Sequence, residues 1–223
     1  MEHHIVKIKS IKKITNDVIQ IVASKPSGFT FVPGQATELS INKIVWVKEK
    51  RPFTFTNLPA HDFLEFTIKT YPEHDGVTKE MLNLKPGDEL VLHDVYGTIT
   101  YKGEGVFIAG GAGVTPFISI LRDLKAKNEI GNNRLIFANK TKADIILEKE
   151  FKEIMDDSFI NILSDEKIEG YHYGKITKEF LKTNVANLKQ YFYICGPPPM
   201  IESVETQLFN LGVDKKLTVK ELF

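Results

Sequence analysis

Up to about residue 101, short runs of apolar and β-branched residues alternate with polar ones at the spacing of β-strands. The runs occupy residues 18–22, 37–41, 44–47, 63–68 and 89–92. Turn-forming residues separate them, at Pro26-Ser27-Gly28, Pro33-Gly34, Asn57-Leu58-Pro59, Pro86-Gly87-Asp88 and Tyr96-Gly97. Only residues 78–84 have a helical pattern in this half. Short strands with such regular punctuation predict a small antiparallel Greek-key β-barrel.

From Gly103 onward, strand-like runs alternate with helical ones. The strand-like runs are residues 106–109, 135–138, 159–163, 191–195 and 217–219. In the last helical run, Met200, Val204 and Leu208 recur at helical spacing and Gly212 follows as a helix-ending residue. This alternation is typical of βαβ units on a parallel sheet. We therefore predict a barrel domain over residues 1–101 and an α/β domain with a five-stranded parallel sheet over residues 102–223.

A glycine-rich loop follows the first strand of the second half. The chain reads Gly110-Gly111-Ala112-Gly113, and Thr115 and Pro116 come next. Threonine is a favoured N-cap and proline a favoured first helical residue, so a helix is predicted to begin here. Glycines between a parallel strand and a helix N-terminus expose backbone N–H groups that bind phosphate. The loop is neither a Walker motif nor G-x-G-x-x-G, and a purely structural glycine turn is the alternative.

A second glycine–proline cluster, Cys195-Gly196-Pro197, again joins a strand end to a helix start. Both loops are expected at the carboxyl edge of one sheet, where open α/β folds bind ligands. Cys195 itself has two interpretations. It is either a small buried hydrophobe, as free cysteines commonly are, or a polarizable side chain that faces a reacting ring.

The barrel half carries a third cluster, Arg51-Pro52-Phe53-Thr54, which brings an arginine, an aromatic ring and a hydroxyl to one strand. A solvated strand arginine is the alternative interpretation. Further along, Gly76-Val77-Thr78 opens the short helical run, close in sequence to the strand residue Lys69. A glycine, a hydroxyl and a helix N-terminus predict a second phosphate site.

Composition narrows the class of protein. Among 223 residues, 42% are hydrophobic and 26% charged, and the 29 basic and 29 acidic residues give zero net charge. This charge balance does not indicate a binding surface for nucleic acid or for an anionic membrane. We see no apolar run of the about 20 residues that cross a membrane, and no signal peptide, so we expect a cytoplasmic protein. The single cysteine excludes disulfides and a cysteine-held iron–sulfur cluster within these residues, and the six histidines lack metal-ligand spacing.

Taken together in chain order, these motifs resemble the ferredoxin–NADP reductase superfamily, the two-domain reductases that bind a flavin and a nicotinamide dinucleotide. They are most similar to the minimal modules of cytochrome reductases and of the reductase half of flavohaemoglobins. The motifs are F-V-P-G-Q at 31–35, R-P-F-T at 51–54, I-K-T-Y at 68–71, G-V-T at 76–78, K-P-G-D at 85–88, G-G-A-G-V-T-P at 110–116, C-G-P-P-P-M at 195–200 and the terminal E-L-F. This ordered set spans nearly the whole chain.

The resemblance implies roles in FAD binding for the barrel motifs. Arg51 would neutralise the pyrophosphate, Phe53 would stack on the isoalloxazine, and Thr54 would bind near its N5. The flavin site as a whole would comprise Arg51, Pro52, Phe53, Thr54, Ile68, Lys69, Tyr71, Gly76, Val77 and Thr78. Because the family usually has tyrosine where Phe53 stands, one hydrogen bond of about 0.5–1.5 kcal/mol would be lost while the stacking surface remains. FMN in place of FAD stays open.

The resemblance also implies a nicotinamide site and a catalytic group. NADH or NADPH would lie on Gly110, Gly111, Gly113, Thr115, Gly196 and Pro197. Cys195 would lie beside the nicotinamide C4, and Phe223 would cover the flavin face with Glu221 close by. Thr54, Cys195, Glu221 and Phe223 are therefore the predicted catalytic residues.

The implied activity is hydride transfer from NAD(P)H to FAD, followed by electron transfer to a separate acceptor: a ferredoxin, a flavodoxin, a haem protein or an oxygenase component. We expect a monomer. A non-catalytic flavin- or nucleotide-binding regulatory module is the main alternative, and a nucleotide-dependent transferase is a third. Lys140 and Lys142 follow the second α/β strand, where a 2′-phosphate would need a cation. However, a Ser-Arg pair is missing and Asp165 would repel a phosphate, which favours NADH.

Overall fold

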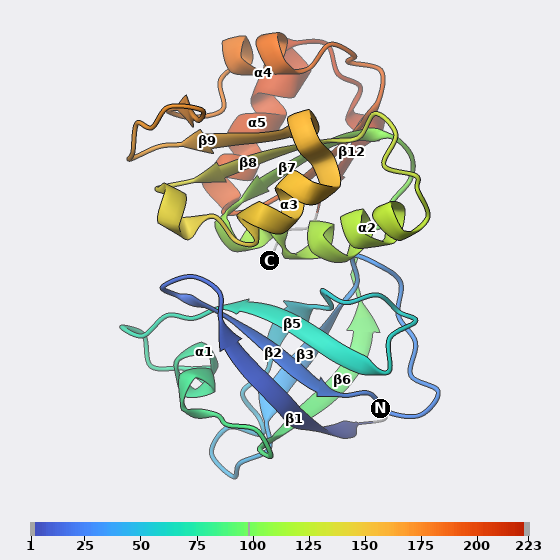
Figure 1. Cartoon of the computed structure of the whole chain (residues 1–223), viewed down its shortest axis with the longest axis vertical. Coiled ribbons are helices and arrows are strands. Elements are labelled where there is room, and N and C mark those ends of the chain that lie inside the picture. Colours follow the sequence, from blue (N-terminus) through green and yellow to red (C-terminus); the bar gives the residue numbers. More distant parts are fainter. Residues whose placement is uncertain (1–2, 98, 221–223) are drawn as a thin grey trace.

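A computed structural model of the chain describes residues 3–97 and 99–220. It forms two stacked domains, with the barrel at the bottom of Figure 1 and the α/β domain above it. No helix within these two ranges is both long and apolar enough to cross a membrane.

The first domain is an antiparallel barrel, as predicted. Its strands are β1 (His4–Lys13), β2 (Val18–Ser24), β3 (Ala36–Ile41), β4 (Arg51–Thr54), β5 (Phe63–Lys69) and β6 (Glu89–Tyr96). They pair in the order β4-β3-β6-β1-β2-β5, so the last strand inserts between β3 and β1. A bridge from Phe55 to Phe66 brings the two edge strands together, and both rings are fully buried in the barrel core. Closure in this way removes free strand edges.

The apolar run at residues 44–47 is not a strand, contrary to the prediction. It lies in the connection between β3 and β4 and forms a turn, in which the N–H groups of Trp46 and Val47 donate to the Lys43 carbonyl. Ile44 is 98% exposed and Val45 74%. A short apolar run does not by itself distinguish a strand from a turn, because too few residues are present to define a period. The predicted helical run at residues 78–84 is present, although only α1 (Val77–Glu80) is an α-helix, and the chain continues as a 3₁₀ turn over Met81–Asn83.

The second domain is a three-layer α/β sandwich on a parallel sheet. Its strands are β7 (Gly105–Gly110), β8 (Arg134–Asn139), β9 (Phe159–Leu163), β10 (His172–Tyr173), β11 (Tyr191–Cys195) and β12 (Thr218–Lys220). The order β10-β9-β8-β7-β11-β12 confirms the parallel sheet and its five predicted strands. The sixth strand, β10, has only two residues, too few to give a pattern in the sequence.

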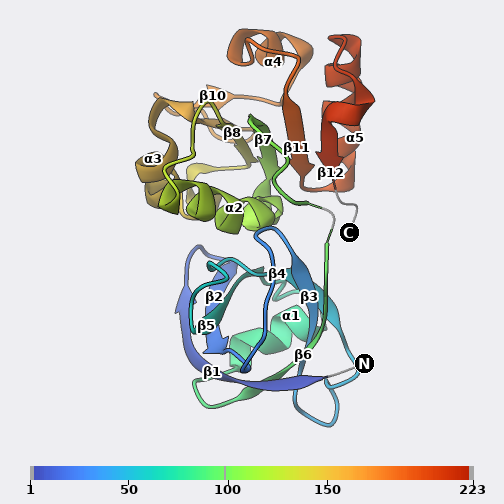
Figure 2. The same cartoon turned by 90° about the vertical axis from the view of Figure 1, so that its right-hand side faces the viewer.

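Helices cover both faces of this sheet, as Figure 2 shows. They are α2 (Thr115–Ala126), α3 (Glu148–Met155), α4 (Lys178–Asn184) and α5 (Pro198–Asn210). Apolar residues of α2 and α3 pack with one face of the strands, and those of α4 and α5 with the other. The first of these clusters also contains Val18 of the barrel and Ile99 of the connection, so the core continues from one domain into the other.

The sequence predicts Thr115 as the N-cap of α2, and the structure shows that this prediction is wrong. The chain winds into a 3₁₀ turn over Gly111–Val114, and Val114 precedes the helix with helical dihedral angles. Thr115 is the first residue of α2, and its hydroxyl donates to the Ala112 carbonyl at 3.0 Å. The correction has a simple cause: the glycine loop is already helical, so the point at which a cap would be needed lies earlier in the chain.

Residues 97–104 connect the two sheets, and the proposed boundary after Tyr101 falls within them. The phenol oxygen of Tyr193 fixes this segment: it accepts hydrogen bonds from the N–H groups of Lys102 and Gly103, at 2.9 and 3.1 Å, and donates to the Gly103 carbonyl at 2.7 Å. Tyr193 is fully buried, and this burial raises its pKa to about 12. The hydroxyl therefore stays a neutral anchor for the connection.

Candidate functional site

Two adjoining cavities lie between the domains, at the carboxyl edge of the parallel sheet. The barrel-side cavity has a volume of about 510 Å³ and the sheet-edge cavity about 600 Å³. Five residues line both: Lys69, Gly110, Gly111, Ala112 and Pro197. The shared wall includes Gly110 at the end of β7 and Pro197 in the loop that follows β11, and the strand order reverses direction between these two neighbouring strands. Ligands of open α/β sheets bind at this type of position.

The barrel-side cavity brings together all three clusters singled out in the sequence. Its barrel wall consists of Arg51, Pro52, Phe53, Thr54, Thr67, Lys69, Tyr71 and Thr78, and its α/β wall of Gly110–Gly113, Thr115 and Cys195–Pro198. Three lining residues, Thr67, Ala112 and Pro198, were not among the predicted site residues. Thr67 could have been predicted from the strand pattern, because it lies two residues before Lys69 on β5 and so shares its face.

Other predicted residues lie elsewhere. The side chains of Ile68 and Val77 point into the barrel core and are 1% exposed, so only their backbone groups are available to a ligand. Gly76 precedes α1 in an extended conformation and does not line the cavity. Glu221 and Phe223 lie outside the described residues.

The cations of this cavity hold only surface partners. Arg51 is exposed; one guanidinium nitrogen donates to the Lys50 carbonyl at 2.6 Å and another lies 3.6 Å from the Glu49 carboxylate. The ammonium of Lys69 lies 3.0 Å from the carboxylate of Asp17. The Arg51 pair is exposed and the Lys69–Asp17 pair is half-buried. An ion pair open to solvent contributes little to stability. Both cations are therefore available to exchange a carboxylate for an anionic ligand.

The three glycines of the loop differ in what surrounds them. A Cβ on Gly110 would lie 2.4 Å from the Met200 sulfur, and one on Gly113 would lie 2.3 Å from the Cys195 carbonyl oxygen. At Gly111, whose φ is +51°, a Cβ would meet no atom within 4 Å. Gly113 is thus required by the packing of backbone on backbone, whereas a Cβ on Gly110 would mainly displace the flexible Met200 side chain. Of the three glycines, only Gly111 has open space around its Cβ position, and it lines both cavities.

Cys195 borders the barrel-side cavity, but its side chain is 1% exposed. It pairs with Ala109 across β11 and β7 and belongs to the apolar cluster beneath α2. The packing thus agrees with the buried-hydrophobe interpretation, and a position beside a nicotinamide ring stays a prediction.

The sheet-edge cavity extends from the shared wall over the ends of β8 and β9. Lining it there are Ala138, Asn139, Lys140, Asp144, Ile146, Ser164, Gly174, Lys175 and Ile176. The Asn139 side chain is the most unusual of these, since it is 8% exposed and neither amide atom has a hydrogen-bond partner. Buried amides are nearly always paired. An orphaned amide at a cavity wall fits a polar ligand that completes it.

Charges of both signs meet at the far end of this cavity, where Lys140, Lys175 and Asp144 line it. Asp144 accepts two hydrogen bonds from Thr141, at 2.9 and 2.7 Å, which fixes its carboxylate beside Lys140. Asp165 accepts from the Ser164 hydroxyl at 2.5 Å. The ammonium of Lys142 lies over the Tyr171 ring, 5.4 Å from its centroid. A second phosphate at this end would therefore meet carboxylates as well as Lys140.

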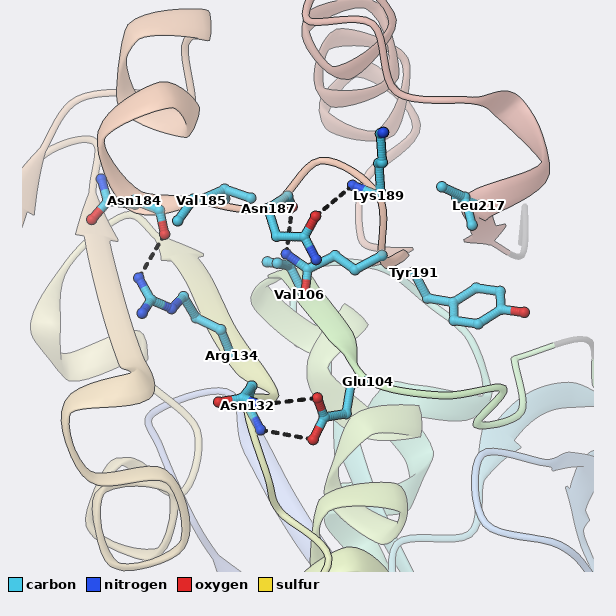
Figure 3. Close-up of a pocket in the computed structure, with 12 residues that line it drawn as sticks. Glu104, Val106, Asn132, Arg134, Asn184, Val185, Asn187, Lys189, Tyr191 and Leu217 are labelled. Atoms are coloured by element: carbon cyan, nitrogen blue, oxygen red, sulfur yellow. Dashed lines mark hydrogen bonds between the residues drawn. The ribbon is translucent and has the colours of Figure 1, made fainter.

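A third cavity, of about 550 Å³, opens at the opposite edge of the sheet, where β7, β8 and β11 begin (Figure 3). Arg134 donates to the Asn184 carbonyl at 2.6 Å, and the carboxylate of Glu104 accepts from the backbone and side chain of Asn132. The Asn132 backbone hydrogen bond is the main reason why the pKa of Glu104 is lowered. None of the predicted site residues lines this cavity, which opens at the edge of the sheet opposite to the other two.

Two family descriptions match this chain in succession. One, the FAD-binding domain, covers residues 3–95, and the other, the oxidoreductase NAD-binding domain, covers residues 107–206. The reductase component of propane 2-monooxygenase from Mycolicibacterium goodii is 33% identical over 220 residues, covering 88% of this chain and 61% of that protein. NADH-cytochrome b5 reductase 2 from Mycosarcoma maydis is 29% identical over 220 residues, covering 88% and 62%. The chain thus spans about three fifths of these curated relatives.

Solved structures share the whole fold. The flavohaem-like FAD/NAD-binding domain of nitric oxide dioxygenase from Vibrio cholerae O1 biovar El Tor gives a TM-score of 0.88 at 21% identity, with 98% of each chain covered. A ferredoxin–NADP⁺ reductase from Neisseria gonorrhoeae, with bound FAD and NADP, gives 0.86 at 20% identity, covering 99% of this chain and 98% of that one. With both domain families matched in order and this fold, the chain belongs to the ferredoxin–NADP reductase superfamily and consists of an FAD-binding barrel followed by an NAD-binding domain.

Proposed function

We propose that this chain is a cytoplasmic, monomeric reductase module that oxidises NADH, reduces FAD and passes the electrons to a separate acceptor protein. The observation that carries the proposal is the wall shared by the two cavities, because it would bring a flavin in one cavity and a nicotinamide in the other into contact. When bound, the nicotinamide supplies a hydride from C4, and the FAD accepts it at N5 and releases electrons one at a time. The protein supplies binding, orientation and the exclusion of water.

The barrel-side cavity suits FAD by its donors and its shape. Arg51 would bind the pyrophosphate in place of its weak contact with Glu49, since a guanidinium pairs with phosphate through two charge-assisted hydrogen bonds. The hydroxyl of Thr78 lies on the same wall. Phe53 would offer a stacking face, and the half-exposed Tyr71 a second apolar surface. Thr54 is 6% exposed and would hold its hydroxyl toward the flavin edge.

The sheet-edge cavity suits an extended dinucleotide. The backbone of Gly111, at the N-terminal side of α2, would approach the pyrophosphate without a side chain in the way. The nicotinamide half would enter the shared wall near Cys195, and the adenosine half would then lie over the ends of β8 and β9. There the unpaired amide of Asn139 would find its hydrogen bonds.

We propose NADH as the donor, because of the charges at the adenosine end. Asp144 lines the cavity, and Asp165 lies close by because its N–H donates to the Lys140 carbonyl at 2.9 Å. A 2′-phosphate would therefore meet carboxylates that offset part of the attraction of Lys140 and Lys175. The name of the relative from Mycosarcoma maydis also specifies NADH.

The acceptor class follows from the relatives and from the single cysteine. The named relatives include reductase components of monooxygenases and cytochrome b5 reductases. Because Cys195 is the only cysteine and is buried, these 223 residues hold no iron–sulfur cluster of their own. We propose that the electrons leave to a redox protein or domain outside this sequence, such as a ferredoxin, a flavodoxin, a haem protein or an oxygenase component.

One experiment tests the proposal and separates its alternatives. The purified protein should be yellow, contain one FAD per chain, and be bleached by NADH under anaerobic conditions. A protein that holds flavin but stays oxidised with both NADH and NADPH would be a regulatory module. A protein that holds no flavin after reconstitution with FAD would contradict the assignment of the barrel-side cavity.

A further inference from the structure

A single arginine on α2 links the two domains. The Nη1 atom of Arg122 donates to the carboxylate of Glu65 at 2.6 Å and to the Thr56 carbonyl at 2.8 Å, and both of these partners belong to the barrel. Its Nε and Nη2 atoms donate to the two carboxylate oxygens of Glu150 on α3, at 2.5 and 2.9 Å. The guanidinium thus joins two carboxylates from different domains.

This cluster is largely removed from water. The side chains of Arg122 and Glu65 are 19% and 11% exposed, and Glu65 also accepts a hydrogen bond from the Thr56 hydroxyl at 2.7 Å. Burial by itself lowers the pKa of Arg122, but the hydrogen bonds and charges of Glu150 and Glu65 outweigh it and raise that pKa above its usual value. Removing one partner from a buried ion pair leaves an uncompensated charge, so each member constrains the others.

A second contact between the domains uses the same face of α2. The hydroxyl of Ser119, one turn before Arg122, accepts a hydrogen bond from the buried N–H of Gly34 at 2.9 Å. A Cβ on Gly34 would lie 2.1 Å from the Ile99 carbonyl oxygen, so the barrel loop reaches α2 only as glycine. Two adjacent turns of α2 are therefore docked on the barrel.

The docked helix and its barrel partners lead directly to the two cavities. Helix α2 begins at Thr115, which lines the barrel-side cavity, directly after the 3₁₀ turn that contains Gly111. On the barrel side, Thr56 lies two residues after Thr54, and Glu65 two residues before Thr67; Thr54 and Thr67 line the same cavity. The cluster therefore links the barrel wall and the α/β wall of the barrel-side cavity, although its own residues do not line that cavity.

We propose that Glu65 and Arg122 are positioning residues that set the relative placement of the two domains for hydride transfer. This inference rests on the proposed function. Hydride transfer requires reacting atoms held about 3–3.5 Å apart, and a displacement of about 1 Å costs on the order of 100-fold in rate. Small rotations of one domain would lengthen this approach while both cofactors stay bound.

The structure offers a matched pair of variants. Glu65→Gln removes a carboxylate that Arg122 binds across the domain interface, and Glu150→Gln removes one that it binds within the α/β domain. Both changes keep the size of the side chain and remove one negative charge that pairs with the same arginine. Arg122→Lys is the third variant, since it keeps the charge but cannot bind both carboxylates in a fork.

Three quantities are measured on each FAD-loaded variant: the flavin content, the Kd for NADH or NAD⁺, and the rate of anaerobic flavin reduction at saturating NADH. We expect Glu65→Gln and Arg122→Lys to slow reduction roughly tenfold, within the range for a sub-ångström displacement. Flavin content and Kd should stay within twofold of the wild type. Glu150→Gln should reduce its flavin at the wild-type rate, although its melting temperature should fall about as much as that of Glu65→Gln.

A second readout does not depend on turnover. Spin labels on Lys9→Cys and Glu179→Cys, one exposed position in each domain, report the distance between the domains, and Cys195 is buried. Glu65→Gln should broaden this distance distribution, whereas Glu150→Gln should not. Equal reduction rates in all variants, or equal slowing by Glu65→Gln and Glu150→Gln, would overturn the positioning role. A wild-type protein that NADH fails to reduce would contradict the proposed function instead, and the spin-label comparison would still decide whether Glu65 holds the domains together.

Discussion

Substitution of two neighbouring glycines by alanine separates ligand binding from folding. At Gly113, a Cβ would lie 2.3 to 2.5 Å from three backbone atoms of Cys195 and Gly196. Backbone cannot rotate away as a flexible side chain can, so Gly113→Ala must push the two loops apart, at a cost of about 1–3 kcal/mol or more. At Gly111 the only cost within the protein is the left-handed conformation at φ +51°, about 1–2 kcal/mol for alanine.

The effect of Gly111→Ala on the ligand is larger than its effect on the fold. A methyl group there would occupy the bare backbone where the pyrophosphate is expected, and each lost hydrogen bond to a charged group costs about 1.5–3 kcal/mol. Since about 1.4 kcal/mol corresponds to a factor of ten, the Kd for NADH should rise roughly 10- to 100-fold. Gly111→Val should raise it further. Gly113→Ala, by contrast, should mainly lower the melting temperature, by about 2–4 °C per kcal/mol in a chain of this size.

The assay compares three measurements on both variants: FAD content by absorbance, thermal unfolding, and titration with NAD⁺ and NADH. Gly111→Ala should keep its flavin and most of its stability while it loses nucleotide affinity. Wild-type affinity for NADH in this variant would refute the assignment of the sheet-edge cavity. Loss of FAD with unchanged NADH affinity would show that the two cavities had been assigned in reverse.

Three further predictions concern single positions and the choice of donor. Arg51→Ala should purify without FAD, because the pyrophosphate loses its charge-assisted partner; full flavin occupancy, measured by absorbance, would contradict this. Steady-state kinetics should give a higher kcat/KM with NADH than with NADPH, given Asp144 and Asp165 at the adenosine end, and a clear preference for NADPH would overturn it. Asn139→Leu should raise the melting temperature, since an unpaired buried amide costs about 1–3 kcal/mol, while it weakens binding of ADP-ribose; unchanged ADP-ribose affinity would place Asn139 outside the site.

The sequence was sufficient for elements whose pattern is set locally. The longer strands of the parallel sheet are apolar runs because both faces of the sheet are covered, and the five predicted strands are present, whereas the two-residue β10 was not predicted. The run at residues 44–47 has the same composition, yet it spans the reversal from β3 to β4 and leaves Ile44 exposed. Which apolar run becomes a strand depended on pairing with distant residues, such as Leu39 with Arg51. That information is absent from a four-residue pattern.

The residues of the candidate site also fall into two groups, those marked by a local motif and those that depend on the folded environment. Thr78 and Gly111 were singled out because each lies in a motif with a phosphate-binding mechanism of its own, whereas the role of Arg51 came from the resemblance to the reductase family. Asn139 was not singled out, since its unpaired amide is a property of the folded environment. The cluster of Arg122 with Glu65 and Glu150 joins residues that are 57 and 28 positions apart. No local spacing marks such a contact, although it holds the domains that the motifs define.

The glycine loop shows why a motif is an incomplete description of a site. Its glycines look alike in sequence and suggest a common role in phosphate binding. In the structure, the strand ends of β7 and β11 approach so closely that a Cβ on Gly196 would lie 3.0 Å from the Gly110 nitrogen. Gly113 and Gly196 are therefore needed for this close approach of backbone to backbone. This close approach also fixes the backbone turn in which Gly111 stays open. The binding surface at Gly111 therefore depends on the packing of the other loop glycines.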